Sequence, residues 1–372
     1  PKDSLLHNIT GACYAGLGQL VSAVKSYEKA IEIKPDYAKA HYNLGGAYHE
    51  LGEHDESIKS YERSIEIDPN YAEAHNNIGN VFQDLGRLDE AFECFEKALT
   101  IKPDYVEVHY SLGVLFQELG KLESMIEHLE YSVTIEPSLS EAHNRLGVAY
   151  TELGKFDDSI ESYLKALDIN PNFSEAYNNL GNTYTEVGQL DDAVESYLKA
   201  LELNSDYPAL HNNLGNAYKE LGQHDNALKS YKNALRYNPD NADAHNYLGN
   251  VFNELGELDE ALKSYKRAIA INPDYADAYN NLGNTLRDSD QLEEALKNFE
   301  KSVELNPNFP EAYNNLGNLL KELGRLDDSV DSFEKSIKIS SNFAEAHNNY
   351  GNLLADLGRL DDSISSFKKA IE

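Results

Sequence analysis

Cysteine, methionine and tryptophan are scarce in this chain of 372 residues, which has two Cys, one Met and no Trp. Cys13 and Cys94 are far apart and neither belongs to a CxxC pair, so the sequence predicts neither a disulfide framework nor a zinc site. Cys94 lies in the apolar stretch AFECFEKAL, which favours a small packed side chain over a reactive thiol. No apolar run approaches the roughly 20 residues needed to span a membrane.

Positive charge is also in short supply. The chain has 64 Asp and Glu against 32 Lys and Arg, which gives a net charge of −32 at pH 7. Such a surface repels phosphate backbones and anionic membranes, so we expect neither nucleic acid nor membrane as a partner. It attracts neutral or basic ligands instead. No signal peptide is visible, which slightly favours a cytoplasmic location. The compartment is left open, because the chain begins at Pro1 rather than Met and an upstream segment could have been removed.

Catalytic motifs are missing as well. The sequence contains no GxSxG elbow, no phosphate-binding Walker loop, no HExxH and no calcium loop. We therefore expect no catalytic residue, no cofactor and no metal site, and predict that this chain is not itself an enzyme, although it could be a fragment of one.

A repeat of 34 residues dominates the sequence. One glycine recurs at this interval without insertion or deletion, at Gly11, Gly45, Gly79, Gly113, Gly147, Gly181, Gly215, Gly249, Gly283, Gly317 and Gly351. We number it position 8 of each repeat. A second glycine occupies position 15 in ten repeats, and proline occupies position 32 in eight. Because glycine ends helices and proline prevents their continuation, each repeat is predicted to form a helix, a turn, a second helix and a turn.

The apolar spacing agrees with this helical hairpin. Positions 4, 7, 8 and 11 share one face of the first helix, and positions 17, 20, 24, 27 and 28 form a stripe on the second. Small residues at positions 8, 20 and 27 allow the two helices to approach closely. A single hairpin cannot bury both its faces, so each must stack on the next.

These residues resemble the tetratricopeptide repeat (TPR) family. The resemblance covers nearly all of Ser4 to Glu372 and implies an all-α, right-handed superhelical solenoid of about eleven helix-turn-helix repeats, with the first helix of each lining a concave face. Position 4, often Trp in the family, is His or Tyr here. Ser289 and Asp290 replace Leu-Gly between the ninth pair of helices and are predicted to form a soft spot or local bend. The expected organisation is one solenoid over residues 1–372, with repeats at 4–37, 38–71, 72–105, 106–139, 140–173, 174–207, 208–241, 242–275, 276–309, 310–343 and a truncated 344–372.

The histidines have a structural explanation. Eight of the twelve occupy position 4, where Tyr177, Tyr279 and Tyr313 stand in other repeats. A position at which Tyr replaces His serves packing rather than catalysis or metal binding. We expect these part-buried imidazoles to resist protonation, so that stability falls below about pH 6.

Asparagine and acidic residues form the candidate binding surface. Positions 2, 5, 6, 9 and 13 of the first helix lie opposite its core stripe, and asparagine fills many of positions 5, 6 and 9 although it forms helices poorly. A ladder of amides can pair with the backbone of an extended peptide; the alternative is hydrogen bonding between repeats. Position 13 is acidic from the second repeat onward, which indicates either a basic ligand or pairing with a neighbouring repeat's Lys. The predicted peptide-binding residues are Asn80, Asn179, Asn182, Asn213, Asn216, Asn250, Asn281, Asn284, Asn315, Asn318, Asn349, Asn352, Glu186, Glu220, Glu254 and Glu322.

This ladder is similar to the repeat arm of the O-linked N-acetylglucosamine transferases, whose catalytic region the chain lacks. It is interrupted by Ser111, Val114, Arg145 and Val148, so we expect it to be cleanest from Asn178 to Asn352.

The favoured function is a protein–protein interaction scaffold that binds an extended neutral or basic peptide segment in an acidic, asparagine-lined groove. One alternative is the substrate-presenting arm of a larger glycosyl- or sulfotransferase, since the chain stops inside a helix at Ile371 and Glu372 without a polar capping helix. Another is a structural solenoid that self-assembles through end-to-end contact of its copies. The partner, oligomeric state and organism stay open.

Overall fold

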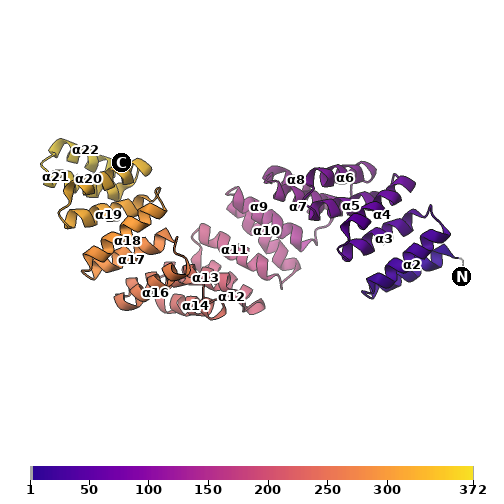
Figure 1. Cartoon of the computed structure of the whole chain (residues 1–372). Coiled ribbons are helices and arrows are strands. Elements are labelled where there is room, and N and C mark those ends of the chain that lie inside the picture. The colour runs from indigo at the N-terminus through magenta and orange to yellow at the C-terminus, as the bar shows by residue number, and fades with distance from the viewer. Residues whose placement is uncertain (1–2, 372) are drawn as a thin grey trace. The chain divides into compact units, whose positions relative to one another are not determined.

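The predicted all-α fold is confirmed by a computed structural model that describes residues 3–371 (Figure 1). Pro1, Lys2 and Glu372 lie outside the described residues. Within them there are no strands, and short turns join helices of 12 to 14 residues. The helices are α1 (Ser4–Gly16), α2 (Leu20–Ile33), α3 (Ala38–Glu50), α4 (His54–Ile67), α5 (Ala72–Asp84), α6 (Leu88–Ile101), α7 (Val106–Glu118), α8 (Leu122–Ile135), α9 (Ser140–Glu152), α10 (Phe156–Ile169), α11 (Ser174–Glu186), α12 (Leu190–Leu203), α13 (Pro208–Glu220), α14 (His224–Tyr237), α15 (Ala242–Glu254), α16 (Leu258–Ile271), α17 (Ala276–Asp288), α18 (Leu292–Leu305), α19 (Pro310–Glu322), α20 (Leu326–Ile339), α21 (Ala344–Asp356) and α22 (Leu360–Ile371).

Each repeat contributes one helical hairpin, whose first helix is odd-numbered and whose second is even-numbered. The chain divides into two compact units, one ending at Thr183 and one beginning at Tyr184, and we describe each separately. In both units a second helix packs on its own first helix and on the first helix of the following repeat. That 1–372 forms one continuous solenoid stays a prediction.

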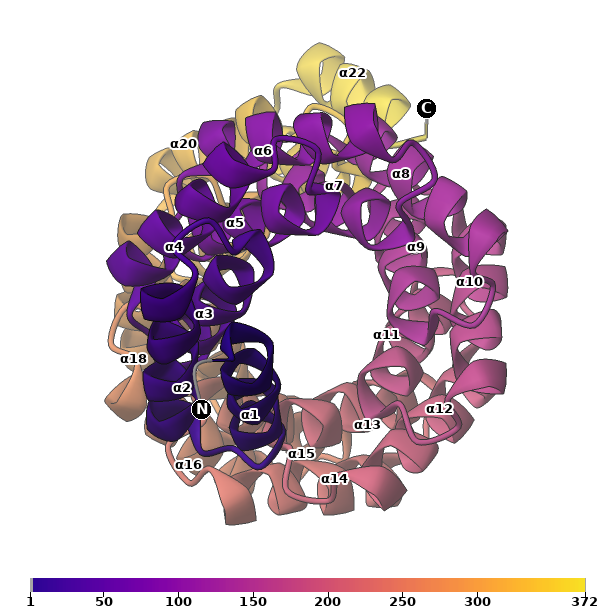
Figure 2. The same ribbon diagram turned by 90° about the vertical axis from the view of Figure 1, so that its right-hand side faces the viewer.

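The first helices lie on the inner side of the curve in each unit. Figure 2 shows α3, α5, α7 and α9 of the first unit inside α4, α6, α8 and α10. In the second unit α13 and α15 lie inside α14 and α16 in the same view. The concave face of each unit is therefore built from the helices that carry the asparagines.

The close approach of the two helices in a hairpin rests on the glycine at position 8. It faces the side chain at position 24 of the same hairpin, which is Tyr or Phe in most repeats and Leu in the fourth. A Cβ added to Gly45 would lie 2.9 Å from three atoms of the Tyr61 ring, and one added to Gly113 would lie 2.6 Å from Leu129. No side chain fits between the helices there, which explains why this glycine recurs at every repeat.

Buried serines satisfy polar groups inside several hairpins. Ser57 Oγ donates a hydrogen bond to the carbonyl of Gly45 at 2.8 Å, and Ser329 Oγ donates to that of Gly317 at 2.7 Å. The same contact joins Ser159 to Gly147 and Ser363 to Gly351. Because a helix carbonyl that already accepts one hydrogen bond can accept a second, these serines remain buried without an unsatisfied hydroxyl.

The ninth repeat keeps the shared turn despite its altered sequence. Among the described residues Asp290 is the only one other than glycine with positive φ, at 61°, close to the 66–76° of the position-15 glycines. Its N–H donates to the Arg287 carbonyl at 2.9 Å. In the next repeat the N–H of the equivalent Gly324 likewise donates to the carbonyl three residues earlier. Ser289 and Asp290 therefore form the same turn as the other repeats and not a local bend. What differs is the backbone strain at Asp290.

Adjacent glycines give a test of the close contact. We expect Gly45→Ala to destabilise the chain by about 1–3 kcal/mol, since the methyl group would overlap Tyr61. Gly46→Ala should instead stabilise it by about 0.5–1 kcal/mol, because its Cβ would meet only Tyr61 Oη, at 3.4 Å, and alanine favours a helix. Urea unfolding followed by circular dichroism measures both. Equal effects of the two substitutions would contradict the packing described.

A second test concerns the strained turn. Asp290→Gly should raise the free energy of unfolding by about 1 kcal/mol, because a left-handed backbone costs an L-residue more than it costs glycine. The reciprocal change Gly324→Asp, at the same position of the next repeat, should lower it by a similar amount. Thermal melts of both variants check this, and a loss of stability in Asp290→Gly would show that the aspartate side chain stabilises the turn.

Candidate peptide-binding faces

Asparagines at positions 5 and 6 join neighbouring repeats. The position-6 amide nitrogen donates to the position-5 amide oxygen of the preceding repeat, a contact that we call a rung. Its two residues are 35 apart in sequence, one repeat plus one residue. Five asparagine rungs, with Nδ2–Oδ1 distances of 2.9–3.3 Å, link Asn43 to Asn8, Asn179 to Asn144, Asn281 to Asn246, Asn315 to Asn280 and Asn349 to Asn314.

Other residues form rungs in the same register. Asn77 donates to the Tyr42 hydroxyl at 3.0 Å, and Arg145 Nε donates to the Tyr110 hydroxyl at 3.1 Å. Most position-5 asparagines are buried. In these repeats the position-5 and position-6 side chains form hydrogen bonds between neighbouring repeats. This is the alternative to peptide binding that the sequence left open.

The position-9 asparagines are arranged differently. Tyr231 Oη donates to Asn216 Oδ1 at 2.7 Å, and Tyr265 Oη donates to Asn250 Oδ1 at 2.8 Å. In the last three repeats position 24 is Phe, which has no hydroxyl, and no side-chain hydrogen bond joins Asn284, Asn318 or Asn352 to another described residue. Of the other predicted position-9 residues, Asn80 accepts a hydrogen bond from Ser111 Oγ at 3.2 Å, and Asn182 is exposed.

The acidic residues at position 13 are exposed and only some have partners. Lys219 Nζ lies 3.2 Å from Glu254, and Lys321 Nζ lies 2.7 Å from Asp356. In these pairs the cation stands at position 12 of the preceding repeat. Within the described part of the chain, the carboxylates of Glu186, Glu220 and Glu322 take part in no hydrogen bond or ion pair. Pairing between repeats thus explains some of these carboxylates and leaves others available.

Most of the position-4 histidines contact a backbone carbonyl in the turn before their own helix. In seven repeats His Nε2 lies 3.0–3.2 Å from the backbone carbonyl six residues earlier, at Pro35, Pro69, Pro103, Pro137, Ser205, Pro239 and Ser341. Burial lowers the pKa of His75, His143 and His245 below 6.5. This agrees with the packing role inferred from the sequence. Residues 3–371 contain no group of three or more His, Cys, Asp or Glu that could hold a metal ion, and none of their helices could cross a membrane.

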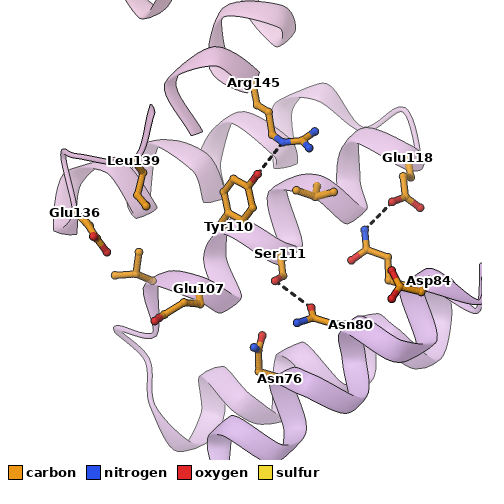
Figure 3. A pocket seen from close by; sticks show the side chains of 13 residues that line it. Asn76, Asn80, Asp84, Glu107, Tyr110, Ser111, Glu118, Glu136, Leu139 and Arg145 are labelled. Carbon is orange, nitrogen blue, oxygen red and sulfur yellow. Dashed lines mark hydrogen bonds between the residues drawn. The ribbon is translucent and has the colours of Figure 1, made fainter. Parts of the chain in front are cut away.

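One cavity opens on the inner helices of the first unit (Figure 3). Its volume is about 640 Å³, and its lining comes from α5, α7, α9 and the turn before α9. It lies where the sequence interrupts the asparagine ladder, because Ser111, Val114 and Arg145 all line it. The sequence marks this region only as an interruption of the ladder, whereas the structure has a cavity there.

Comparison with known families identifies the repeat. Models described as TPR repeat match 11–52, 45–86, 79–120, 147–188, 181–222, 283–324 and 317–358. The chain belongs to the tetratricopeptide repeat family. Further models of the family match residues 106–139, 212–276 and 264–297. No curated protein matches the chain.

Solved structures of the same class resemble the chain. Yeast Tom70 is 15% identical with a TM-score of 0.53, over 99% of this chain and 91% of that one, which supports the fold. MamA is 32% identical over 43% of this chain and 94% of that one, with a TM-score of 0.41. YrrB, described as a TPR protein with an unusual peptide-binding site, is 28% identical over 50% and 96%, with a TM-score of 0.40. The family and the repeat architecture make this chain a protein-interaction scaffold.

The histidines give a pH test. Because burial favours the neutral rings, the unfolded chain binds more protons than the folded chain as pH falls below about 6.5, and stability decreases there. The triple variant H75Y/H143Y/H245Y, which places at position 4 the residue found in three other repeats, should lose less stability between pH 7.5 and 5.5. Urea unfolding at both pH values measures the difference. An unchanged difference would mean that other groups cause the pH dependence.

Proposed function

We propose that the concave face of the second unit binds an extended neutral or basic stretch of another polypeptide along its position-9 asparagines. The observation that carries this proposal is the division of the asparagines into two groups. Those at positions 5 and 6 are mostly occupied in rungs, whereas Asn284, Asn318 and Asn352 form no side-chain hydrogen bond with another described residue.

The open amides suit a peptide backbone. Each carries donors and an acceptor, so it can pair with both the N–H and C=O groups of an extended chain regardless of its side chains. In the seventh and eighth repeats the tyrosine hydroxyls hold Asn216 Oδ1 and Asn250 Oδ1, which leaves each Nδ2 as a fixed donor for a peptide carbonyl. Amides held in place in this way lose little freedom on binding.

Charge supports a neutral or basic ligand. Glu220 and Glu322 stand in the last turn of the same inner helices and have no cationic partner among the described residues. With a net charge of −32, the chain repels acidic segments over several ångströms and accelerates the approach of basic ones. Binding should therefore weaken as salt concentration rises.

Asparagine variants separate binding from folding. Peptides selected by the full chain from a random 12-residue phage library should bind N284A/N318A/N352A at least about tenfold more weakly, since up to three hydrogen bonds of about 0.5–1.5 kcal/mol each are lost. The melting temperature of this variant should not fall, because these side chains form no hydrogen bond within the described structure and alanine favours a helix more than asparagine does.

The matched control is N314A in a rung. Asn314 is 1% exposed, accepts from Asn349 and donates to Glu345 at 2.9 Å. Its removal should lower stability by about 1–3 kcal/mol, while peptide affinity at a temperature where the variant is folded stays the same. If N284A/N318A/N352A kept full affinity for every selected peptide, the position-9 row would not be the binding surface.

A further inference from the structure

The rung at the third repeat is broken. Asn76 occupies position 5, but position 6 of the next repeat is Ser111, whose short side chain donates to Asn80 instead. Asn76 is 6% exposed, and its Oδ1 has no hydrogen-bond partner, whereas the position-5 Oδ1 accepts a hydrogen bond in each of the five asparagine rungs. A buried amide oxygen without a donor is unfavourable and is rare in folded proteins.

A second acceptor beside it also lacks its usual donor. In two other repeats the position-5 amide donates to the glutamate at position 2 of the following repeat, from Asn314 to Glu345 at 2.9 Å and from Asn144 to Glu175 at 3.4 Å. Here the Asn76 amide donates to Asn77 at 3.3 Å, and Glu107 has no partner among the described residues. Asn76 and Glu107 both line the same cavity.

The rest of the lining defines what would fit between them. Val106, Val114 and Leu139 supply apolar surface next to the acceptors. Glu136 adds another carboxylate that has no partner in the described structure. Figure 3 shows Asn76 and Glu107 on the side of the cavity away from Arg145.

We propose that this cavity binds the side chain of a lysine or arginine residue. The ammonium or guanidinium group donates to Asn76 Oδ1 and Glu107, and the aliphatic stem lies against Val106, Val114 and Leu139. Long basic side chains combine an apolar stem with a charged end, which is the combination that this lining accommodates. The inference rests on the proposed function, the binding of an extended polypeptide, and deepens it for the first unit: this cavity takes a basic residue of a polypeptide bound there.

An anionic ligand at Arg145 fits the lining less well. The Arg145 guanidinium already donates to Tyr110 and Gln117. The carboxylates of Asp84, Glu107, Glu118 and Glu136 face the same space against this one cation. The potential in the cavity is therefore negative, and an anion would also leave Asn76 Oδ1 without a donor.

The test uses the full chain with isotope-labelled valine and leucine methyl groups. Lysine or arginine with acetylated and methylamidated ends is titrated in, and the resonances of Val106, Val114 and Leu139 are followed by NMR. Saturable shifts with either residue are expected, and none with capped norleucine or capped glutamate. Absence of saturable shifts, or shifts with glutamate, would overturn the proposal.

Two variants locate the site. Ser111→Asn restores the amide that completes the rung, so it should weaken lysine binding at least tenfold without lowering the melting temperature. Glu107→Gln should weaken binding similarly, whereas the control Glu345→Gln, where the carboxylate is paired with Asn314, should leave it unchanged. Equal binding by wild type and Ser111→Asn would refute the site.

The capped residues also separate this inference from the proposed function. If they bind but the chain selects no peptide from the library, the cavity stands and the peptide-binding function fails. If selected peptides bind through the position-9 asparagines while the capped residues do not bind, only the cavity assignment fails.

Discussion

The contact on which the rest of the structure depends is the close approach of a large side chain in the second helix of each hairpin to a glycine in the first. In ten described hairpins the side chain at position 24 occupies the space where a Cβ of the position-8 residue would be. This contact fixes the rotation of the first helix, so that its core stripe faces the second helix. Positions 5, 6 and 9 are then turned toward the concave side, where neighbouring first helices lie next to one another.

Stacking then divides the asparagines by register. A rung needs residues 35 apart, so it joins position 5 to position 6 of the next repeat. A contact from position 6 to position 9 of the preceding repeat spans 31 residues instead and occurs at Asn80 and Asn250. The identity of position 24 decides how open position 9 is: Tyr231 and Tyr265 reach the amide oxygens, whereas Phe299 and Phe333 cannot. At the cavity Ser111 occupies a rung position and leaves Asn76 Oδ1 without a donor, while the Asn76 amide donates to Asn77 rather than to Glu107.

The fold could be predicted because its determinants are local. Gly45 and Pro69 mark helix packing and helix ends within one repeat, and the 34-residue period places the glycine in eleven repeats and the proline in eight. The role of each asparagine could not be assigned in this way. Asn281 and Asn284 look equivalent on one helix face and differ in what the preceding repeat and position 24 of their own repeat place beside them. Ser111 appeared in the sequence only as a gap in the ladder; its effect depends on the buried oxygen of a residue 35 positions earlier. A deviation at position 6 opposite an asparagine at position 5 is the signal that could have identified it.

The central claim is that the rung asparagines hold neighbouring repeats together, whereas Asn284, Asn318 and Asn352 at position 9 remain available to bind a peptide. The most direct test is the hydrogen exchange of asparagine side-chain amides in the free protein, measured by NMR on the full chain. The account predicts that the amide hydrogens of Asn315 and Asn349 exchange markedly more slowly than those of Asn318 and Asn352 on the same helices. Equal exchange rates for the two pairs would contradict it.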